Sequence, residues 1–138
     1  MNLWLPILVL ALSSAFGFWW RRRQGQFKKA AVVSSTDNFI SNSEIGIELG
    51  QRVTILQFSS AFCSPCKATA QIITNLVNNM NDVVYTQIKS EENLKLIEKF
   101  DIKSTPTVVF FNGYGMEVGR AVGTPTNDQV LAAISAVR

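Results

Sequence analysis

Two cysteines separated by two residues, Cys63 and Cys66, constrain this chain more than any other feature of its sequence. An apolar, β-branched run at positions 53–58 precedes them, and apolar residues at helical spacing follow between positions 72 and 80. A strand that leads into a helix here places the sulfur of Cys63 at the helix N-terminus, where unpaired backbone N–H groups and the helix dipole favour an anion. Cys66, one turn further on, can attack a mixed disulfide formed by Cys63. The pattern predicts a dithiol/disulfide redox site.

The small number of cysteines and the absence of histidine argue against a zinc site or a histidine-dependent catalytic site. The chain has two cysteines and no histidine, too few ligands for a structural zinc site within one chain and no base for a Cys-His or Ser-His-Asp nucleophile. No metal or organic cofactor is implied. Apart from a redox couple, the pair could form a local structural disulfide, stay as two buried inert thiols, or share a metal with the pair of a second chain.

The net charge of +3 has a local origin. Five of the 13 lysine and arginine residues lie at positions 21–29, ahead of any acidic residue, which leaves 8 basic against 10 acidic residues from Ala30 onward. The rest of the chain is therefore not basic, and this balance argues against nucleic-acid binding.

An uncharged apolar run occupies residues 3–20, and three arginines follow it directly. Eighteen helical residues extend roughly 27 Å, enough for the hydrocarbon core of a bilayer, and Trp19 and Trp20 close the run where aromatic side chains favour the interface. A cleaved signal peptide would carry its basic residues before the run. We therefore predict a membrane anchor at 1–20, a basic juxtamembrane segment and linker at 21–47, and a folded domain at 48–138.

The basic residues also predict the orientation of this anchor. No lysine or arginine precedes the run, while five follow it within nine positions. By the positive-inside rule the N-terminus lies outside and the folded domain in the cytoplasm; the opposite orientation would make the domain extracytoplasmic. The difference matters because a cytoplasmic dithiol is kept reduced, whereas an extracytoplasmic one is oxidised.

The remaining patterns predict alternating strands and helices. After the strand at 53–58 and the helix that ends near 78–79, we expect a strand at 83–88, an amphipathic helix at 91–100, a buried strand at 108–111, a return strand at 116–122 and a terminal helix. The short helix should bury Leu94 and Ile97. Asn112-Gly113 predicts a hairpin, and Thr126 with Gln129 predicts a capping box at the start of the last helix. Residues 30–33 could form an edge strand, and residues 34–43 have the composition of a loop.

In this order of elements, the motif Phe62-Cys63-Ser64-Pro65-Cys66-Lys67 and the later Thr105-Pro106 resemble the thioredoxin family over residues 48–138. The resemblance implies an α/β, thioredoxin-like fold with a central mixed sheet flanked by helices, here preceded by one transmembrane helix. It implies that Cys63 is the nucleophile and Cys66 the resolving cysteine of a redox disulfide. It also implies that Pro106 is cis beside the sulfurs, and that Thr105 offers backbone hydrogen bonds to an extended substrate.

The chain departs from the family pattern beside the first cysteine. Phe62 replaces the usual tryptophan, which keeps an apolar substrate-binding surface but removes the indole N–H. Ser64 and Pro65 replace the usual Gly-Pro between the cysteines, and in this family the dipeptide helps to set the redox potential. Pro65 itself suits the first turn of a helix, where no N–H is needed.

A further departure lies in the strand before the motif. Gln57 occupies the position of a buried aspartate in the family, and Gln87 falls where the family has the lysine that pairs with it. We expect the two glutamines to hydrogen-bond to each other in the interior, which avoids the desolvation cost of an ion pair. An amide cannot take the proton that a carboxylate could accept from the resolving thiol.

These features predict a membrane-tethered thiol–disulfide oxidoreductase that reduces protein disulfides in the cytoplasm. The tether through residues 3–20 would favour membrane proteins as substrates, and an unidentified reducing partner must restore the dithiol. One alternative is a disulfide oxidase or maturation factor that acts outside the cytoplasm. Another is a thioredoxin-fold interaction module in which the cysteines are incidental.

Overall fold

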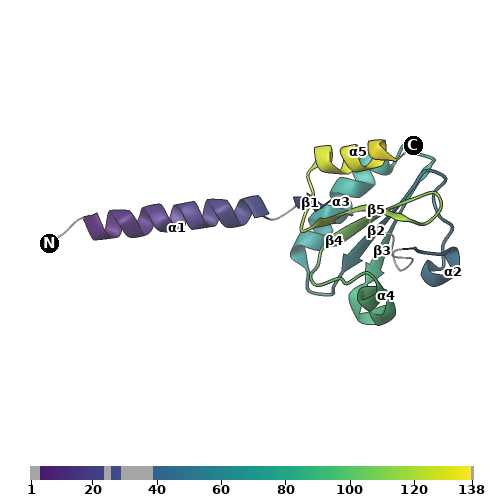
Figure 1. Ribbon diagram of the computed structural model, residues 1–138, viewed down its shortest axis with the longest axis horizontal. Coiled ribbons are helices and arrows are strands. Elements are labelled where there is room, and N and C mark those ends of the chain that lie inside the picture. Colours follow the sequence, from purple (N-terminus) through teal and green to yellow (C-terminus); the bar gives the residue numbers. More distant parts are fainter. Residues whose placement is uncertain (1–3, 24–25, 29–38, 138) are drawn as a thin grey trace.

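The sheet at the centre of the fold has five strands in the order β1-β5-β4-β2-β3, as the computed structural model in Figure 1 shows. The structure describes residues 4–23, 26–28 and 39–137. The strands are β1 (Gln26–Lys28), β2 (Val53–Ser59), β3 (Val83–Lys89), β4 (Thr107–Asn112) and β5 (Glu117–Val122). The helices are α1 (Trp4–Arg23), α2 (Asn42–Ile45), α3 (Ser64–Val77), the 3-10 helix η2 (Ser90–Glu92), α4 (Leu94–Lys99) and α5 (Asn127–Ala136).

Helices cover both faces of this sheet, so the domain has three layers (Figure 1). Alternation along β2 sends Val53 and Ile55 to one face and Leu56 and Phe58 to the other. The first pair packs with residues of α3 and α5, and the second pair packs with Leu96 of α4 and with the Phe100 ring that follows it. Every residue of β2 is buried, as expected for a central strand with helices on both faces.

The pairing of the strands makes the sheet mixed. β2 runs parallel to β3 and antiparallel to β4, β4 pairs antiparallel with β5, and β5 pairs antiparallel with β1. The register between β4 and β5 shifts where Phe110 lies opposite Gly119 and Phe111 opposite Glu117, which makes Val118 the extra residue of a β-bulge. The expected α/β fold with a mixed sheet flanked by helices is confirmed. The capping box is also present, because Thr126 and Gln129 exchange backbone-to-side-chain hydrogen bonds.

The face of the short helix differs from the prediction. Leu94 is exposed, and Leu96 is buried in its place. The reason is that the predicted helix at 91–100 is two elements: η2 ends at Glu92, and α4 begins a separate turn after Asn93. This break changes which side chains point at the sheet.

Residues before position 48 also contribute to the domain. β1 forms an edge strand against β5, and Ile40 is fully buried in the cluster beneath α4. The Ile40 N–H donates to the Gly115 carbonyl at 2.8 Å, and a β-carbon at Gly115 would collide with the Ile40 carbonyl. The predicted boundaries at 20 and 47 stay predictions. The strand expected at residues 30–33 and the first part of the loop expected at 34–43 lie outside the described residues.

Helix α1 stands apart from the three layers (Figure 1). Its side chains from Trp4 to Trp20 are exposed. Within the part of the chain that the structure describes, no helix is both long enough and apolar enough to cross a membrane. The transmembrane helix predicted at residues 3–20 is therefore not found.

An ion pair within β5, whose carboxylate is buried, is hydrogen-bonded to the end of α4. Arg120 donates two hydrogen bonds to the Glu117 carboxylate, at 2.6 and 2.7 Å, and a third to the carbonyl oxygen of Phe100 at 2.7 Å. The Glu117 side chain is only 1% exposed. A buried carboxylate depends on such a bidentate partner, because its desolvation is otherwise uncompensated.

Replacing Arg120 by methionine should therefore lower the free energy of unfolding by about 3 kcal/mol, because Glu117 would stay buried without a counter-charge. Urea unfolding of the full chain in detergent micelles measures the change. Lys103→Met is the control, since Lys103 pairs with Asp101 at the surface, with both side chains more than three-quarters exposed. That substitution should cost less than about 0.5 kcal/mol. Equal losses in the two variants would contradict the argument.

Candidate active site

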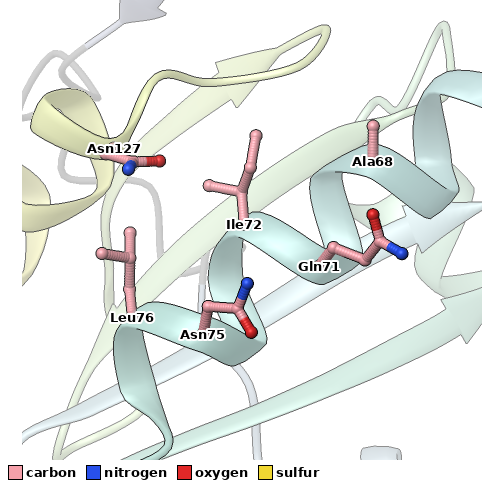
Figure 2. A pocket seen from close by; sticks show the side chains of 6 residues that line it. All are labelled: Ala68, Gln71, Ile72, Asn75, Leu76 and Asn127. Carbon is pink, nitrogen blue, oxygen red and sulfur yellow. The ribbon is translucent and has the colours of Figure 1, made fainter.

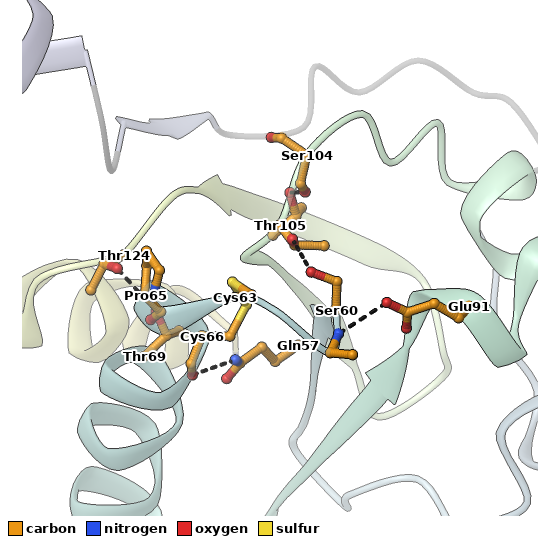
Figure 3. Close-up of a disulfide and its surroundings, with 12 residues drawn as sticks. Gln57, Ser60, Cys63, Pro65, Cys66, Thr69, Glu91, Ser104, Thr105 and Thr124 are labelled. Carbon is orange, nitrogen blue, oxygen red and sulfur yellow. Dashed lines mark hydrogen bonds between the residues drawn. A yellow bond between two sulfur atoms is a disulfide. The ribbon is translucent and has the colours of Figure 1, made fainter.

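The two cysteines lie where β2 passes into α3. Cys63 is the residue that precedes the first turn of α3, and Cys66 lies within that turn. The two sulfurs form a disulfide (Figure 3), and the Cα atoms of Cys63 and Cys66 are 5.3 Å apart. Cys63 is half-buried, whereas Cys66 is only 4% exposed. The local sequence explains the tight turn, because Pro65 occupies a first-turn position at which a missing N–H costs nothing.

The first turn of α3 is tied to the loop after β5. The Thr69 hydroxyl, which is buried, donates to the Pro65 carbonyl at 2.9 Å and lies 3.2 Å from the Thr124 hydroxyl (Figure 3). Ser64, by contrast, is exposed. The predicted site residues Ser64 and Pro65 are thus exposed beside the disulfide, and the buried Thr69 hydroxyl is hydrogen-bonded to the Pro65 carbonyl.

A second loop faces the disulfide, at the start of β4. The Thr105–Pro106 peptide bond is cis, as the resemblance implies. The hydroxyls of Ser60 and Thr105 lie 3.1 Å apart and join this loop to the one that carries the cysteines (Figure 3). The Pro106 carbonyl accepts a 2.8 Å hydrogen bond from the Gly123 N–H. Residues from two distant parts of the chain are thereby held together where β2 ends and β4 begins.

Phe62 forms the exposed rim of this site. Its side chain is fully exposed. An apolar ring that gains nothing from the domain's own core is available to contact another molecule beside Cys63.

The prediction that Gln57 pairs with Gln87 is wrong, because Gln57 pairs with Tyr85 instead. Gln57 is fully buried, as expected, but Gln87, directly opposite it in the β2–β3 register, is exposed. The Gln57 amide instead donates to the carbonyl oxygen of Cys66 at 2.8 Å and accepts a 2.6 Å hydrogen bond from the Tyr85 hydroxyl. Burial raises the pKa of Tyr85 to about 12. The sequence analysis did not predict Tyr85 as the partner of Gln57, although Tyr85 precedes Gln87 by two residues and therefore lies on the same face of β3.

Glu91 of η2 is a second residue that the sequence did not predict. Its carboxylate accepts a 2.9 Å hydrogen bond from the Ala61 N–H, in the loop just before Phe62 (Figure 3). This bond to the backbone N–H lowers the pKa of Glu91. The exposed carboxylate therefore holds the loop that presents Cys63.

The Glu91 contact predicts a pH dependence. Because the folded-state pKa is lowered, the contribution of this carboxylate to stability is present above the ordinary carboxyl pKa and is lost as the pH falls through the lowered value. Glu91→Gln keeps an oxygen acceptor but does not titrate. The melting temperatures of wild type and variant should therefore converge as the pH falls from 7 to 3. Glu98→Gln, at an exposed position of α4, is the control and should not reproduce this convergence.

A second hollow on the surface lies away from the cysteines and their neighbouring loops. A shallow pocket lies between α3 and α5, lined by Ala68, Gln71, Ile72, Asn75, Leu76 and Asn127 (Figure 2). It contains none of the predicted site residues. Among the described residues, no group of three or more cysteine or acidic side chains could hold a metal ion, and no cysteine is free.

A disulfide at the start of a helix, opposite a cis-proline loop on a mixed sheet, defines a thiol–disulfide oxidoreductase. The family model described as Thioredoxin matches residues 31–136. The chain therefore belongs to the thioredoxin family.

Individual relatives agree with this assignment. Thioredoxin H5 of Oryza sativa subsp. japonica is 28% identical over 92 residues, which is 67% of this chain and 67% of the relative. Thioredoxin of Chlamydia pneumoniae is 32% identical over 91 residues, or 66% of this chain and 82% of the relative. The X-ray structure of Fasciola hepatica thioredoxin shares the fold, with a TM-score of 0.57 and 22% identity over 64% of this chain and 84% of that one.

Proposed function

We propose that this domain reduces disulfide bonds of other proteins, with Cys63 as the nucleophile and Cys66 as the resolving cysteine. The observation that carries the proposal is the unequal exposure of the two sulfur-bearing residues: Cys63 is half-buried at the helix N-terminus and Cys66 is almost fully buried. Only Cys63 is accessible to a large substrate. The helix N-terminus also favours its thiolate.

The reaction takes two thiol–disulfide exchanges. The Cys63 thiolate attacks one sulfur of the substrate disulfide, forms a mixed disulfide and releases the other substrate sulfur as a thiolate. Cys66, after losing its proton to solvent, attacks the Cys63 sulfur and releases the second substrate thiolate. The substrate gains two electrons, and the domain is left with the Cys63–Cys66 disulfide. A dithiol donor must then reduce the domain again.

The residues around the disulfide suit an extended protein substrate. Phe62 supplies an exposed apolar surface next to Cys63. Thr105 and Pro106 lie opposite, in a loop fixed to the cysteine loop through Ser60. We assign substrate contact to these three residues, with Phe62 in place of the tryptophan that is usual in the thioredoxin family.

The reduction potential tests the direction of the reaction. The full chain, in detergent micelles, is equilibrated with thiol–disulfide buffers, and the fraction of Cys63–Cys66 disulfide is read by thiol trapping. A potential near about −270 mV supports a reductase, and one near about −120 mV would instead support an oxidase. Cys63→Ser should abolish reduction of a disulfide-bonded protein substrate. Failure to form the disulfide at any poise would leave only a binding role, and full reduction of the substrate by Cys63→Ser would show that Cys63 is not the nucleophile.

We further propose that residues 3–20 attach the domain to the cytoplasmic face of a membrane. Two features support attachment: α1 carries no charge from Trp4 to Trp20, and its apolar side chains are all exposed, a surface that is costly to leave in water. The five basic residues at positions 21–29 suit the anionic cytoplasmic leaflet. Attachment would raise the effective concentration of membrane-protein substrates.

Fractionation of sealed vesicles tests this attachment. Protein that sediments with vesicles and resists both salt and alkaline extraction is inserted, whereas release by salt indicates surface binding. Added protease should digest the domain only when the cytoplasmic side faces outward. The proposal would be overturned if the domain were found in the soluble fraction. It would also be overturned if the domain resisted protease in vesicles whose cytoplasmic side faces outward.

A further inference from the structure

A chain of hydrogen bonds, buried at Gln57 and half-buried at Tyr85, connects β3 to the resolving cysteine. The Tyr85 hydroxyl donates to Gln57 Oε1, and Gln57 Nε2 donates to the carbonyl oxygen of Cys66. Figure 3 shows the Gln57 end of this chain beneath the disulfide. We propose that Tyr85 is a positioning residue for disulfide exchange, which acts through Gln57 to hold Cys66 ready to resolve the mixed disulfide. This inference rests on the proposed function, in which Cys66 performs that step.

The Cys66 carbonyl decides the orientation of the amide. A carbonyl oxygen only accepts hydrogen bonds, so Gln57 must turn its NH₂ group toward Cys66 and its oxygen toward β3. Tyr85 then meets an acceptor, and its hydroxyl must donate. With a pKa of about 12, this hydroxyl remains protonated throughout the range in which thiols react. The network therefore has one arrangement at every relevant pH.

The network matters most at the mixed-disulfide stage. In the oxidised domain, the bond to Cys63 fixes the place of the Cys66 sulfur. When Cys63 is bonded to a substrate instead, that covalent constraint is gone, and the position of Cys66 depends on the first turn of α3. Gln57 anchors the backbone of this turn to β2. Accurate placement of an attacking atom contributes strongly to intramolecular reaction rates.

Neither partner in the network takes part in proton transfer. An amide is neither an acid nor a base in water, and Tyr85 stays protonated. The proton that leaves Cys66 is therefore accepted by neither of them. Loss of the Tyr85 hydroxyl should slow resolution without changing how its rate depends on pH, which distinguishes positioning from acid–base catalysis.

The test follows the two steps separately with the aromatic disulfide 5,5′-dithiobis(2-nitrobenzoate). Attack by Cys63 of the reduced full chain releases one thionitrobenzoate, and resolution by Cys66 releases a second. Tyr85→Phe should leave the first phase unchanged and slow the second about fivefold, the effect of losing one ordinary hydrogen bond. Tyr114→Phe is the matched control, because Tyr114 is 82% exposed in the β4–β5 hairpin. It should leave both phases at wild-type rates.

Gln57→Met provides a second variant, since it keeps the length of the side chain but removes both hydrogen bonds. It should slow the second phase at least as much as Tyr85→Phe. Equal slowing of both phases, no slowing, or an altered pH profile of the second phase would overturn the inference. If the wild type releases two equivalents of thionitrobenzoate and Tyr85→Phe releases both at wild-type rates, only the role of Tyr85 is refuted. Release of one equivalent by the wild type would refute the proposed function as well.

Discussion

Replacing Cys66 by serine should abolish turnover while Cys63 still captures substrate. The serine hydroxyl is not ionised at neutral pH and cannot displace a thiolate from Cys63, so the reaction should stop at the mixed disulfide. We expect multiple-turnover reduction of a disulfide-bonded protein to fall by more than about 10³-fold. Mass spectrometry under non-reducing conditions should show one substrate molecule bound to each chain, released by dithiothreitol.

Cys63→Ser is the matched control for this experiment. Cys66 is only 4% exposed, so a chain with Cys66 as its sole cysteine should capture no protein substrate. Both variants should keep the fold, since each replaces sulfur by oxygen at one position of the same turn. Capture by Cys63→Ser but not by Cys66→Ser would reverse the two roles. Near-normal turnover by Cys66→Ser would show that a resolving thiol within the chain is not required.

The parts of the site that were predictable depend on local chemistry. The position of Cys63 at a helix start follows from a β-branched run, a proline in the first turn and helical spacing, all within thirty positions of the sequence. β4 was recognisable because a strand covered on both faces is almost entirely apolar, and β2 was recognisable from its apolar, β-branched run. The burial of Gln57 was predicted from the resemblance, because it occupies the position of a buried aspartate in the family.

The parts that were missed depend on contacts between distant residues. Gln87 lies opposite Gln57 in register but reaches the surface, while the longer Tyr85 side chain reaches Gln57 from two residues away. Glu91 meets Ala61 across 30 positions, and neither residue has a local pattern that indicates the other. β1 is three residues long, too short to show an alternation of polar and apolar residues. Such contacts appear only once the register and the course of the chain are fixed.

Gln57→Glu should make the stability of the domain strongly dependent on pH. A protonated carboxyl can reproduce the amide, because it donates to the Cys66 carbonyl and accepts from Tyr85. An ionised carboxylate cannot donate, and it would lie in a fully buried position beside a carbonyl oxygen. Burial should therefore raise the pKa of the introduced carboxyl well above the ordinary value of about 4.3.

The sign of the effect follows from this raised pKa. The folded state binds the proton more tightly than the unfolded state, so stability is fully present below the ordinary pKa and is lost as the pH rises toward the folded-state value. The loss should approach about 1.4 kcal/mol per pH unit, and about 3 kcal/mol by pH 7. Urea unfolding of wild type and variant at several pH values between 4 and 8 measures this difference.

Gln87→Glu separates burial from the mere addition of a charge. Gln87 is the register neighbour of Gln57 on β3, yet it is exposed, so a carboxylate there stays hydrated. Its stability difference from wild type should stay within about 0.5 kcal/mol and change little over the same pH range. If Gln57→Glu also showed no slope, position 57 would be open to water. The hydrogen bond between Gln57 and Cys66 would then contribute little to holding the first turn of α3, and the role assigned to Tyr85 would lose its physical basis.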